Sequence, residues 1–241
     1  TLMPPELAPH YSEAIVRLPH CYLPTDRQRP IALPPPRQAL GLPAQGTVIA
    51  LMPGSRRAEV EHLAPTFLAA AVLMHELHPD WHFILPAAGE ARLAQLRALI
   101  DTDPAWRTLP LQLLSGQSHT ALAACDQTLI ASGTATLEVA LCKRPMVISY
   151  RISPLTYALV RHRIKVPHVG LPNILLGREA VPELLQSRAK PQLLADALIK
   201  WYESPEDCAA LQRDFHELHH MLWRDTAELA AQNVLEEAGA L

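Results

Sequence analysis

The sequence predicts an α/β fold, a Rossmann-like doubly wound parallel sheet followed by a helical C-terminal tail. Short apolar runs rich in valine, isoleucine and leucine recur through the middle of the chain. Segments with apolar residues at helical spacing separate these runs. Strands that alternate with helices form parallel sheets covered on both faces. Right-handed crossovers between such strands then give the doubly wound arrangement.

The expected elements follow one another in a regular order. The five expected strands are apolar runs at residues 47–52, 81–87, 109–116, 127–132 and 145–150. The four segments between them have helical character and occupy residues 61–77, 90–100, 118–125 and 134–143. After Tyr150 the alternation loosens. Three helices are expected at the C-terminal end, at Pro191–Tyr202, Pro205–Leu222 and Thr226–Glu237.

Residues 1–46 differ from the rest in their proline content. The stretch 29–43, RPIALPPPRQALGLP, contains three consecutive prolines at 34–36. Such a stretch is extended and excludes a helix or a central strand. It ends in a short helix that Gly41 terminates. We therefore expect a proline-rich linker at 1–46 and a folded domain with C-terminal helices at 47–241.

Composition limits the classes of function. The chain has 241 residues, a net charge of -3 and a pI near 6.4, which argues against a general nucleic-acid binder. Its four cysteines are scattered without a C-x-x-C pair, which fits a reducing compartment and no zinc site of the usual spacing. No run of about 18 uncharged apolar residues occurs, and the first residues lack a signal-peptide pattern. We expect a cytoplasmic protein.

The loop after the first strand is the first candidate ligand contact. In parallel sheets, ligands bind beyond the carboxyl ends of the strands. Gly54 permits a tight turn and close approach of the backbone, while Ser55 can cap a helix or bond an anionic oxygen. Arg56 carries a forked, permanently charged donor that matches phosphate. A turn with a surface arginine explains the same residues.

The second candidate is the turn after the fourth strand. Free N–H groups at a helix start form an anion site, and Ser132 and Thr134 add hydroxyl donors. Gly133 and Ala135 keep the surface low. Glu138 falls one turn into the helix, where its carboxylate either accepts two ribose hydroxyls or serves the helix N-terminus as a cap.

Three longer motifs resemble one family. They are LMPGSRRAEVEHLAPTFLAAA, ASGTATLEVALCKRPMVISYRISPLTYALV and IKVPHVGLPNILLGREAVPELLQ, and a terminal F-x-x-L-H follows at Phe215 to His219. Residues 47–241 resemble lipid-A-disaccharide synthase. The resemblance implies the carboxy-terminal, nucleotide-sugar-binding half of a GT-B glycosyltransferase. That family makes lipid A, for the lipopolysaccharide of Gram-negative bacteria, from UDP-2,3-diacylglucosamine and 2,3-diacylglucosamine 1-phosphate. UDP leaves with inversion, and no metal or cofactor is implied.

The resemblance also implies roles at the donor site. Glu138 would bind the ribose, and positive charge at the β-phosphate would stabilise the departing UDP. The diphosphate would be held by Gly54, Ser55, Arg56, Ser132, Gly133, Thr134, Ala135 and Thr136. The third motif adds three polar residues to the same cleft, Asn173, Glu183 and Gln186. Asn173 serves equally well as a turn residue and Glu183 as an acid at a helix start.

No catalytic base can be named from this sequence. In GT-B enzymes the base and the acceptor site normally come from the amino-terminal lobe, which the single Rossmann unit here leaves out. The chain alone is expected to bind UDP or a UDP-sugar and to turn over little. Residues 1–46 instead resemble the SPINDLY-type bacterial O-GlcNAc transferase family. Two alternatives therefore stay open, a protein O-GlcNAc transferase-like fusion and a non-catalytic UDP-sugar-binding fragment.

Other features bear on partners. Residues 157–166, YALVRHRIKV, form either an ordinary helix with a basic face or a peripheral contact with the anionic inner membrane. The C-terminal helices can cross to a second subunit, giving a homodimer, or fold back on a missing lobe. Two histidine groups have metal-like spacing, but Pro79 interrupts the first and apolar neighbours surround the second, so no metal is expected. These groups are His75, His78 and His82, and His216, His219 and His220.

Overall fold

The computed structural model describes residues 9, 11–12, 33–152, 167–223 and 226–239. The chain forms two compact units. One unit is Pro34–Phe215, and the other combines Thr1–Leu33 with His216–Leu241. The first unit contains the sheet and both candidate loops.

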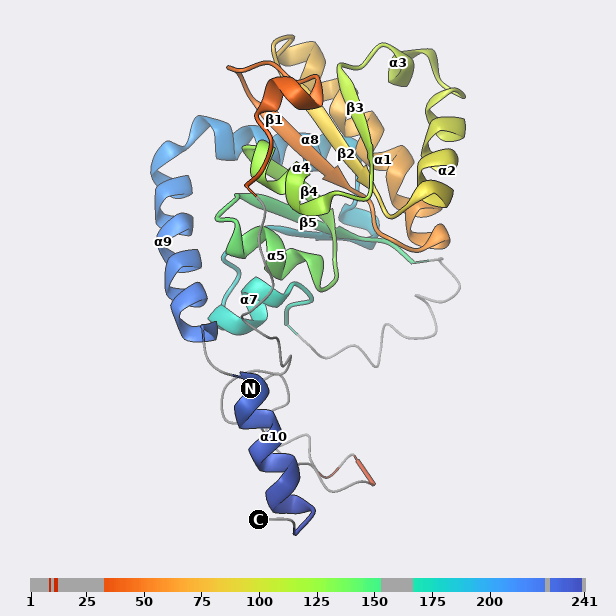
Figure 1. Cartoon of the computed structure of the whole chain (residues 1–241). Coiled ribbons are helices and arrows are strands. Elements are labelled where there is room, and N and C mark those ends of the chain that lie inside the picture. The colour runs from red at the N-terminus through yellow and green to blue at the C-terminus, as the bar shows by residue number, and fades with distance from the viewer. Residues whose placement is uncertain (1–8, 10, 13–32, 153–166, 224–225, 240–241) are drawn as a thin grey trace. The chain divides into compact units, whose positions relative to one another are not determined.

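The first unit is built on a six-stranded, fully parallel sheet with the order β3-β2-β1-β4-β5-β6 (Figure 1). The order reverses direction between β1 and β4, which is the switch point of a Rossmann-type sheet. The strands are β1 (Val48–Met52), β2 (His82–Ala87), β3 (Leu111–Ser115), β4 (Gln127–Ala131), β5 (Met146–Tyr150) and β6 (Glu183–Leu185). The predicted doubly wound fold and all five predicted strands are confirmed.

Helices cover both faces of this sheet (Figure 1). On one face α1 (Arg57–Leu77) packs against α8 (Pro191–Glu203) and against α2 (Glu90–Ile100). The other face carries α4, α5 and α7, where α5 contacts α7. Their bounds are α4 (Ser118–Ala124), α5 (Ala135–Leu141) and α7 (Leu171–Leu176). This three-layer arrangement explains why the strands are apolar on both sides.

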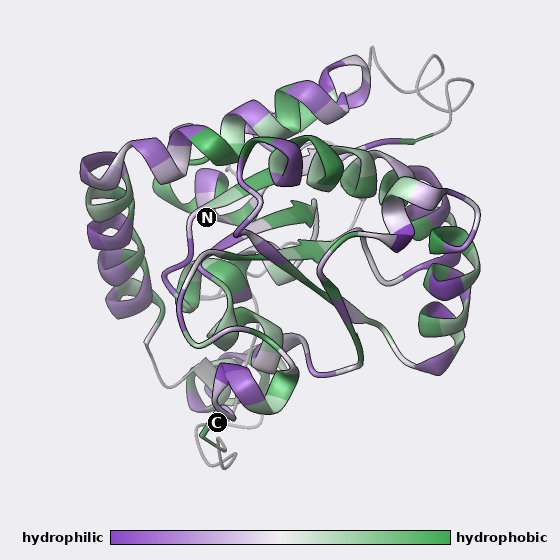
Figure 2. Ribbon diagram, turned by 90° about the horizontal axis from the view of Figure 1, so that it is seen from above, coloured by the Kyte–Doolittle hydropathy of each residue, from purple (hydrophilic) through white to green (hydrophobic). Residues whose placement is uncertain are grey.

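The core lies between the sheet and the α1, α2 and α8 layer. Phe67 of α1, Phe83 of β2 and Trp81, just before β2, are fully buried there, and Leu194 and Leu198 of α8 also belong to the cluster. Figure 2 shows the strands coloured as hydrophobic over most of their length, whereas the covering helices mix hydrophobic and hydrophilic residues. Burying each large apolar side chain contributes about 1.5–3 kcal/mol, so this layer stabilises the sheet that carries the loops.

Several elements were absent from the prediction. The edge strand β6 has only three residues, too few to show a period. The short α3 (Pro104–Arg107) begins where Asp103 accepts a hydrogen bond from the Ala105 amide at 2.9 Å. Helix α7 has Pro172 in its first turn and ends at Gly177, whose φ is +70°. These capping residues, the proline in a first turn and the terminal glycine are common at helix ends, but they have no apolar periodicity from which a helix could be predicted.

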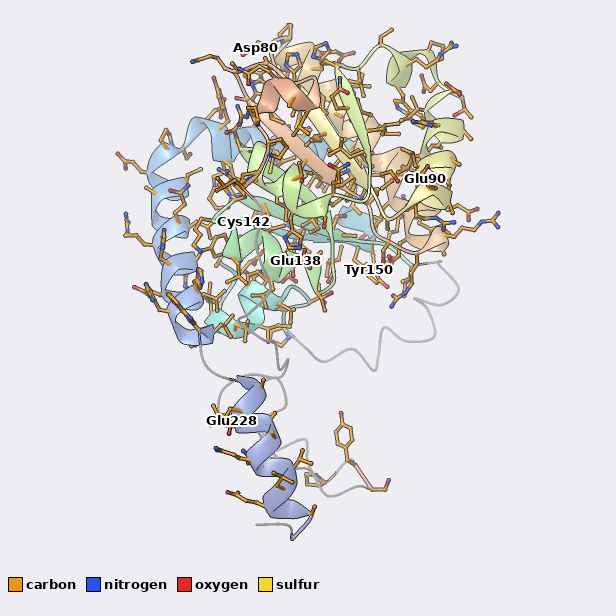
Figure 3. All side chains as sticks on the ribbon, viewed as in Figure 1. Asp80, Glu90, Glu138, Cys142, Tyr150 and Glu228 are labelled. Carbon is orange, nitrogen blue, oxygen red and sulfur yellow. The ribbon has the colours of Figure 1, made fainter. Side chains whose placement is uncertain are left out.

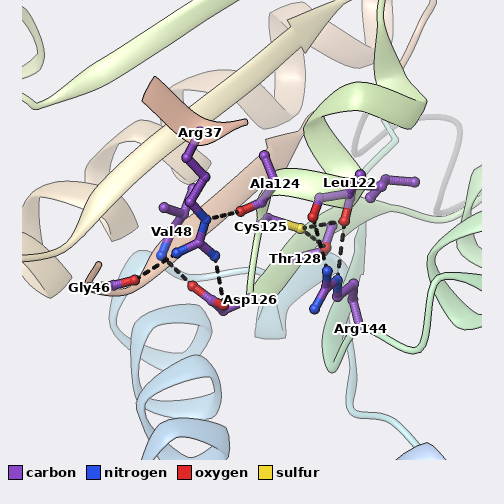
Figure 4. A network of polar contacts seen from close by, with 10 residues as sticks. Arg37, Gly46, Val48, Leu122, Ala124, Cys125, Asp126, Thr128 and Arg144 are labelled. Carbon is purple, nitrogen blue, oxygen red and sulfur yellow. Dashed lines mark hydrogen bonds and ion pairs between the residues drawn. The ribbon is translucent and has the colours of Figure 1, made fainter. Parts of the chain in front are cut away.

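Residues 34–46 pack with the sheet, so the compact unit begins before the expected boundary at residue 47. The short 3-10 helix η2 (Arg37–Leu40) ends at Gly41, as expected, with a φ of +72°. Arg37 donates to the carbonyl oxygens of Ala124 at 2.7 Å and Gly46 at 3.0 Å, and to Asp126 Oδ1 at 2.8 Å. Asp126 Oδ2 accepts the Val48 amide at 2.8 Å (Figure 4).

A second arginine, Arg144, binds the end of α4 at the same edge of the sheet. Arg144 donates to the carbonyl oxygens of Leu122 at 3.2 Å and Ala123 at 3.0 Å (Figure 4). The last carbonyls of a helix have no partner within the helix. Arg37 and Arg144 together satisfy three consecutive carbonyls at the end of α4, and their charge suits the negative end of a helix. These contacts lie beside the amino ends of β1 and β4, away from the candidate loops.

The C-terminal region is helical, as predicted. After α8 come α9 (Pro205–Leu222) and α10 (Thr226–Glu237), and η3 (Gln186–Arg188) precedes α8. Helix α10 exposes Val234 and Leu235. Within the described ranges, the search for membrane-spanning segments finds no helix of sufficient length and apolarity to cross a bilayer.

Candidate functional site

A cavity of about 510 Å³ opens at the carboxyl edge of the sheet. The ends of three adjacent strands line it, with Met52 from β1, Pro86 and Ala87 from β2, and Ala131 from β4. The cavity therefore spans the switch point between β1 and β4, where parallel sheets of this order bind ligands. Its volume lies in the range of small-molecule sites, roughly 300–1,000 Å³.

The loop after β1 forms one wall and is held by Glu59. The Glu59 carboxylate accepts the amides of Ser55 at 3.0 Å and Arg56 at 3.1 Å, and it pairs with Arg56 Nη1 at 3.0 Å. Gly54 has a φ of +115°, and a Cβ there would lie 2.6 Å from Glu59 Cβ. Sequence reasoning missed Glu59, although an acid at the third helical position is a known capping signal.

This arrangement changes what the loop can offer a ligand. The amides of Ser55 and Arg56 already donate to Glu59, so they are not free. The Arg56 side chain is 81% exposed, and its pair with Glu59 uses only part of the guanidinium. An exposed pair of this kind contributes little stability, about 0–1 kcal/mol. The Ser55 hydroxyl and the remaining Arg56 donors are the groups that can reach into the cavity.

The turn after β4 forms the facing wall. Two of its hydroxyl groups are engaged within the protein, because Ser132 Oγ donates to the Val169 carbonyl at 3.0 Å and Thr136 Oγ1 donates to the Gly133 carbonyl at 2.7 Å. Thr136 is fully buried and does not line the cavity, unlike Ser132. Of the two hydroxyls expected to contact a ligand, that of Ser132 is therefore engaged within the protein, whereas the Thr134 side chain is exposed and lines the cavity.

Main-chain donors also face the cavity. Gly133, Thr134 and Ala135 all line the cavity, and within the described part of the chain none of their amides donates a hydrogen bond. Gly133 and Thr134 are exposed, and a Cβ at Gly133 would meet nothing within 4 Å. Because α5 has only seven residues, these local N–H groups matter more than any helix dipole. Successive free amides form a concave anion-binding surface.

Glu138 lines the same cavity from the first turns of α5 (Figure 3). Its side chain is 41% exposed, and its Oε2 lies 4.0 Å from Nε2 of the exposed His119. Among the described residues no backbone amide donates to this carboxylate. Its carboxylate therefore makes no capping hydrogen bond, although it remains an acid in the first turn of α5.

The three polar residues of the later motif lie elsewhere. Asn173 is fully buried, Glu183 is 7% exposed, and Gln186 begins η3 with a φ of +51°. None of the three lines the cavity. Asn173 Nδ2 donates to Glu183 Oε1 at 2.8 Å, so these two residues satisfy each other inside the protein. The structure does not bring them to the cleft, where they were expected.

None of the described cysteines lines this cavity, and neither do His78 and His82. Burial raises the pKa of the Cys125 thiol to about 11, and burial also raises the pKa of Cys142 and Cys208. His78 stacks on Trp81 with 4.2 Å between ring centroids. His82 Nδ1 lies 3.0 Å from the Asp80 carbonyl oxygen. Over the described ranges, no group of three or more His, Cys, Asp or Glu side chains is arranged to hold a metal ion.

The sheet order and the cavity at its switch point define a Rossmann-type ligand-binding domain. A sequence model of the family described as lipid-A-disaccharide synthetase matches residues 34–234. The chain belongs to this family. It is 59% identical over 203 residues to the lipid-A-disaccharide synthase of Neisseria meningitidis serogroup B, an alignment that covers 84% of this chain and 53% of the relative. The chain thus spans about half the length of the curated relatives that it matches.

Solved structures agree on the fold. WaaG, a glycosyltransferase involved in lipopolysaccharide biosynthesis, matches with a TM-score of 0.55 and 15% identity, over 83% of this chain and 49% of its own. The O-GlcNAc transferase of Thermobaculum terrenum matches with a TM-score of 0.51 and 20% identity, over 98% of this chain and 42% of its own. At such identities the likeness establishes a shared architecture, that of the GT-B glycosyltransferase lobe.

Proposed function

We propose that this chain is the donor-binding half of a lipid-A-disaccharide synthase and that its cavity holds the UDP moiety of UDP-2,3-diacylglucosamine. The observation that carries this proposal is the run of amides at Gly133 to Ala135, which donate to no acceptor among the described residues and face the cavity beside Arg56 and Glu138. Hydrogen-bond donors that can bind an anion lie in one cleft with a carboxylate that can accept hydroxyl groups. This combination suits a diphosphate joined to a ribose.

The diphosphate and the ribose of UDP each have a partner in this arrangement. The diphosphate lies against the Gly133, Thr134 and Ala135 amides, with the Arg56 guanidinium and the Ser55 hydroxyl on its other side. The ribose hydroxyls donate to Glu138. Thr136 and Ser132 support the turn from behind through their internal hydrogen bonds.

The chemistry follows from this placement. In the reaction a hydroxyl of 2,3-diacylglucosamine 1-phosphate forms a bond to the donor sugar carbon, the bond from that carbon to the β-phosphate breaks, and UDP leaves with inversion. Negative charge builds on the departing phosphate, and the fixed positive donors around it stabilise that charge. The hydroxyl proton passes to a base that we assign to the other half of the complete enzyme. This chain alone therefore binds UDP and forms little disaccharide.

Calorimetric titration of the chain with UDP, UMP and uridine tests the proposal. We expect UDP to bind more tightly than UMP and far more tightly than uridine, because the second phosphate meets the amides and Arg56. Equal affinity for all three, or no binding of UDP, would reject the donor site. An assay for disaccharide formation by the chain alone provides a second check, and turnover at the rate of a complete synthase would reject the half-enzyme assignment.

We further propose that the acceptor is the acylated sugar phosphate and that the enzyme works at the cytoplasmic face of the inner membrane as a peripheral protein. The basic segment 157–166, to which this membrane contact was assigned, lies outside the described residues apart from its sequence. Release of the protein from membranes by high salt is the expected behaviour. Assembly as a homodimer through the C-terminal helices is tested by light scattering of the full chain and of a chain that ends at Phe215.

A further inference from the structure

Glu183 is a buried carboxylate whose partners contain no basic side chain among the described residues. It is 7% exposed and begins the edge strand β6. Its Oε2 accepts the Val169 amide at 2.9 Å, while its Oε1 accepts the Gly170 amide at 3.0 Å and Asn173 Nδ2 at 2.8 Å. Burying a carboxylate is costly unless hydrogen bonds compensate for lost water. Its three neutral donors provide that compensation.

Asn173 fixes the other side of this carboxylate. It is fully buried, and its Nδ2 also donates to the Val181 carbonyl at 2.8 Å. Its Oδ1 accepts the amides of Ala180 at 2.8 Å and Val181 at 2.9 Å. The side-chain amide therefore uses both donors and both acceptor positions within the protein. Neither Asn173 nor Glu183 has a polar group left for a ligand.

The loop that Glu183 holds reaches the donor cavity through one hydrogen bond. The Val169 carbonyl accepts Ser132 Oγ at 3.0 Å, and the Ser132 amide donates to the Ser149 carbonyl at 2.9 Å. The Gly170 backbone packs closely on β5, since a Cβ there would lie 2.3 Å from Ile148 Cδ1. Ser132 thus lies clamped between β5 and the 169–170 backbone. The unpaired amides of the cavity begin at the next residue.

We propose that Glu183 is a positioning residue for the donor site, acting through Val169 and Ser132 on the Gly133–Ala135 turn. This inference rests on the proposed function, because it takes the turn as the diphosphate contact. Glu183 orients two consecutive amides so that the Val169 carbonyl points at the Ser132 hydroxyl. That hydroxyl then fixes the direction of the amides that follow. Asn173 supports Glu183 and does not touch the donor.

A double-mutant cycle in UDP binding tests this chain of contacts. Glu183→Gln keeps the shape but presents an NH2 group to an amide donor, and we expect UDP affinity to fall by roughly tenfold because a buried donor loses its acceptor. Ser132→Ala should cause a similar loss. Because both changes break one path, the double variant should bind UDP about as weakly as the weaker single variant. If Glu183→Gln instead caused only a general structural defect, its loss of UDP binding free energy would add to the loss caused by Ser132→Ala.

A matched control separates positioning from general stability. Asp126→Asn removes a carboxylate that also accepts a backbone amide and a side-chain donor, but at the amino edge of the sheet. It should lower the melting temperature while leaving the UDP dissociation constant within about twofold of wild type, since distant sites act independently. Weakened UDP binding in this control to the extent seen for Glu183→Gln would overturn the inference.

The wild-type protein gives an independent measurement should Glu183→Gln fail to fold. Titration with UDP, followed by amide NMR, should shift the Val169 and Gly170 resonances although neither residue lines the cavity. Unchanged resonances at both positions would overturn the inference, as would additive losses in the cycle. Absence of UDP binding by the wild type would overturn the proposed function together with this inference, whereas equal binding by wild type and Glu183→Gln overturns the inference alone.

Discussion

Arg37 and Asp126 form an ion pair, 2.8 Å from Nη2 to Oδ1, that fastens the segment before β1 to the start of β4. The same carboxylate accepts the Val48 amide. Asp126→Asn is therefore expected to lower the free energy of unfolding by about 1–3 kcal/mol, because a charged partner is lost and a buried amide is left with a poorer acceptor. The figure belongs at the low end, since the Asp126 side chain is 42% exposed. Urea unfolding measures it.

The exposed Asp80, labelled in Figure 3, offers the control for that measurement. Asp80→Asn makes the same change of charge without removing a side-chain contact of the described residues. Its unfolding midpoint should match the wild type. Equal stability of the two variants would show that the Arg37 contacts do not stabilise the fold.

Gly54→Ala should destabilise the protein by about 1–3 kcal/mol, because a φ of +115° is strained for any residue with a side chain. The new methyl group would also clash with Glu59, whose carboxylate accepts the loop amides, and displace it. Gly133→Ala is the matched control, since its Cβ meets no atom within 4 Å. Thermal melting compares the two. A melting temperature for Gly54→Ala equal to that of Gly133→Ala would contradict the strain argument.

Arg56→Ala should weaken UDP binding by roughly tenfold, the effect of losing a charged hydrogen-bond donor. Arg57→Ala tests specificity, because Arg57 is exposed, adjacent, and does not line the cavity. UDP affinity in that variant should stay close to wild type. Titrations at two salt concentrations should show a weaker salt dependence for Arg56→Ala alone. Similar losses in both variants would point to general charge attraction.

Glu138→Gln should weaken the binding of UDP and of uridine to a similar degree. The affinity for inorganic pyrophosphate, measured by its competition with UDP, should stay unchanged. The reason is that Glu138 is assigned to ribose and the amides to phosphate. The exposed Glu61, two residues beyond Glu59, provides the charge-matched control through Glu61→Gln. If Glu138→Gln binds pyrophosphate more tightly than the wild type and its affinity for uridine is unchanged, then the carboxylate acts only by repelling the phosphate charge.

Cys125 should make stability depend on alkaline pH. Its pKa is about 11 in the folded protein, against 9.0 for the free thiol, because burial disfavours the thiolate. The unfolded state therefore loses its proton first, and the stability that Cys125 contributes is fully present below pH 9 and is lost as the pH rises towards 11. The difference between the two pKa values corresponds to roughly 2–3 kcal/mol.

The measurement is the urea midpoint of wild type and Cys125→Ala between pH 8 and pH 10.5. The variant starts less stable, because it leaves a small cavity, and the gap between the two proteins should narrow as the pH rises. Thiol labelling of the native protein at pH 8 should also spare Cys125, which is buried. A gap independent of pH would contradict the raised pKa.

The sequence predicted the strands well because a fully parallel sheet buries both faces of each strand. Runs such as Val48–Leu51 are entirely apolar and completely buried. The edge strand β6 escaped prediction because it has three residues and begins with an acid. Helix α1 begins at Arg57, four positions before its predicted start at residue 61, because Glu59 caps its first turn. Capping of this kind replaces apolar spacing as the signal for a helix start.

The candidate site was predicted in outline and not in its contacts. The two loops could be found because strand ends mark where a parallel sheet binds ligands. The occupation of the Ser55 and Arg56 amides by Glu59 could not, because it depends on a side-chain rotamer. Cleft positions for Asn173 and Glu183 are implied only by the resemblance of the third motif to the family. Their burial arises from Val169, Gly170 and Val181, whose nearness only the folded chain shows.

The unpaired amides at Gly133, Thr134 and Ala135 have a consequence for how this protein tolerates change. Recognition by main-chain groups is carried by every amino acid except proline, so genetic drift can alter Thr134 and Ala135 while the donor contacts persist. Alanine scanning would pass over this turn as silent. Replacing one of these peptide bonds with an ester, by semisynthesis, would remove the N–H without touching a side chain and would reveal a contact that alanine scanning does not detect.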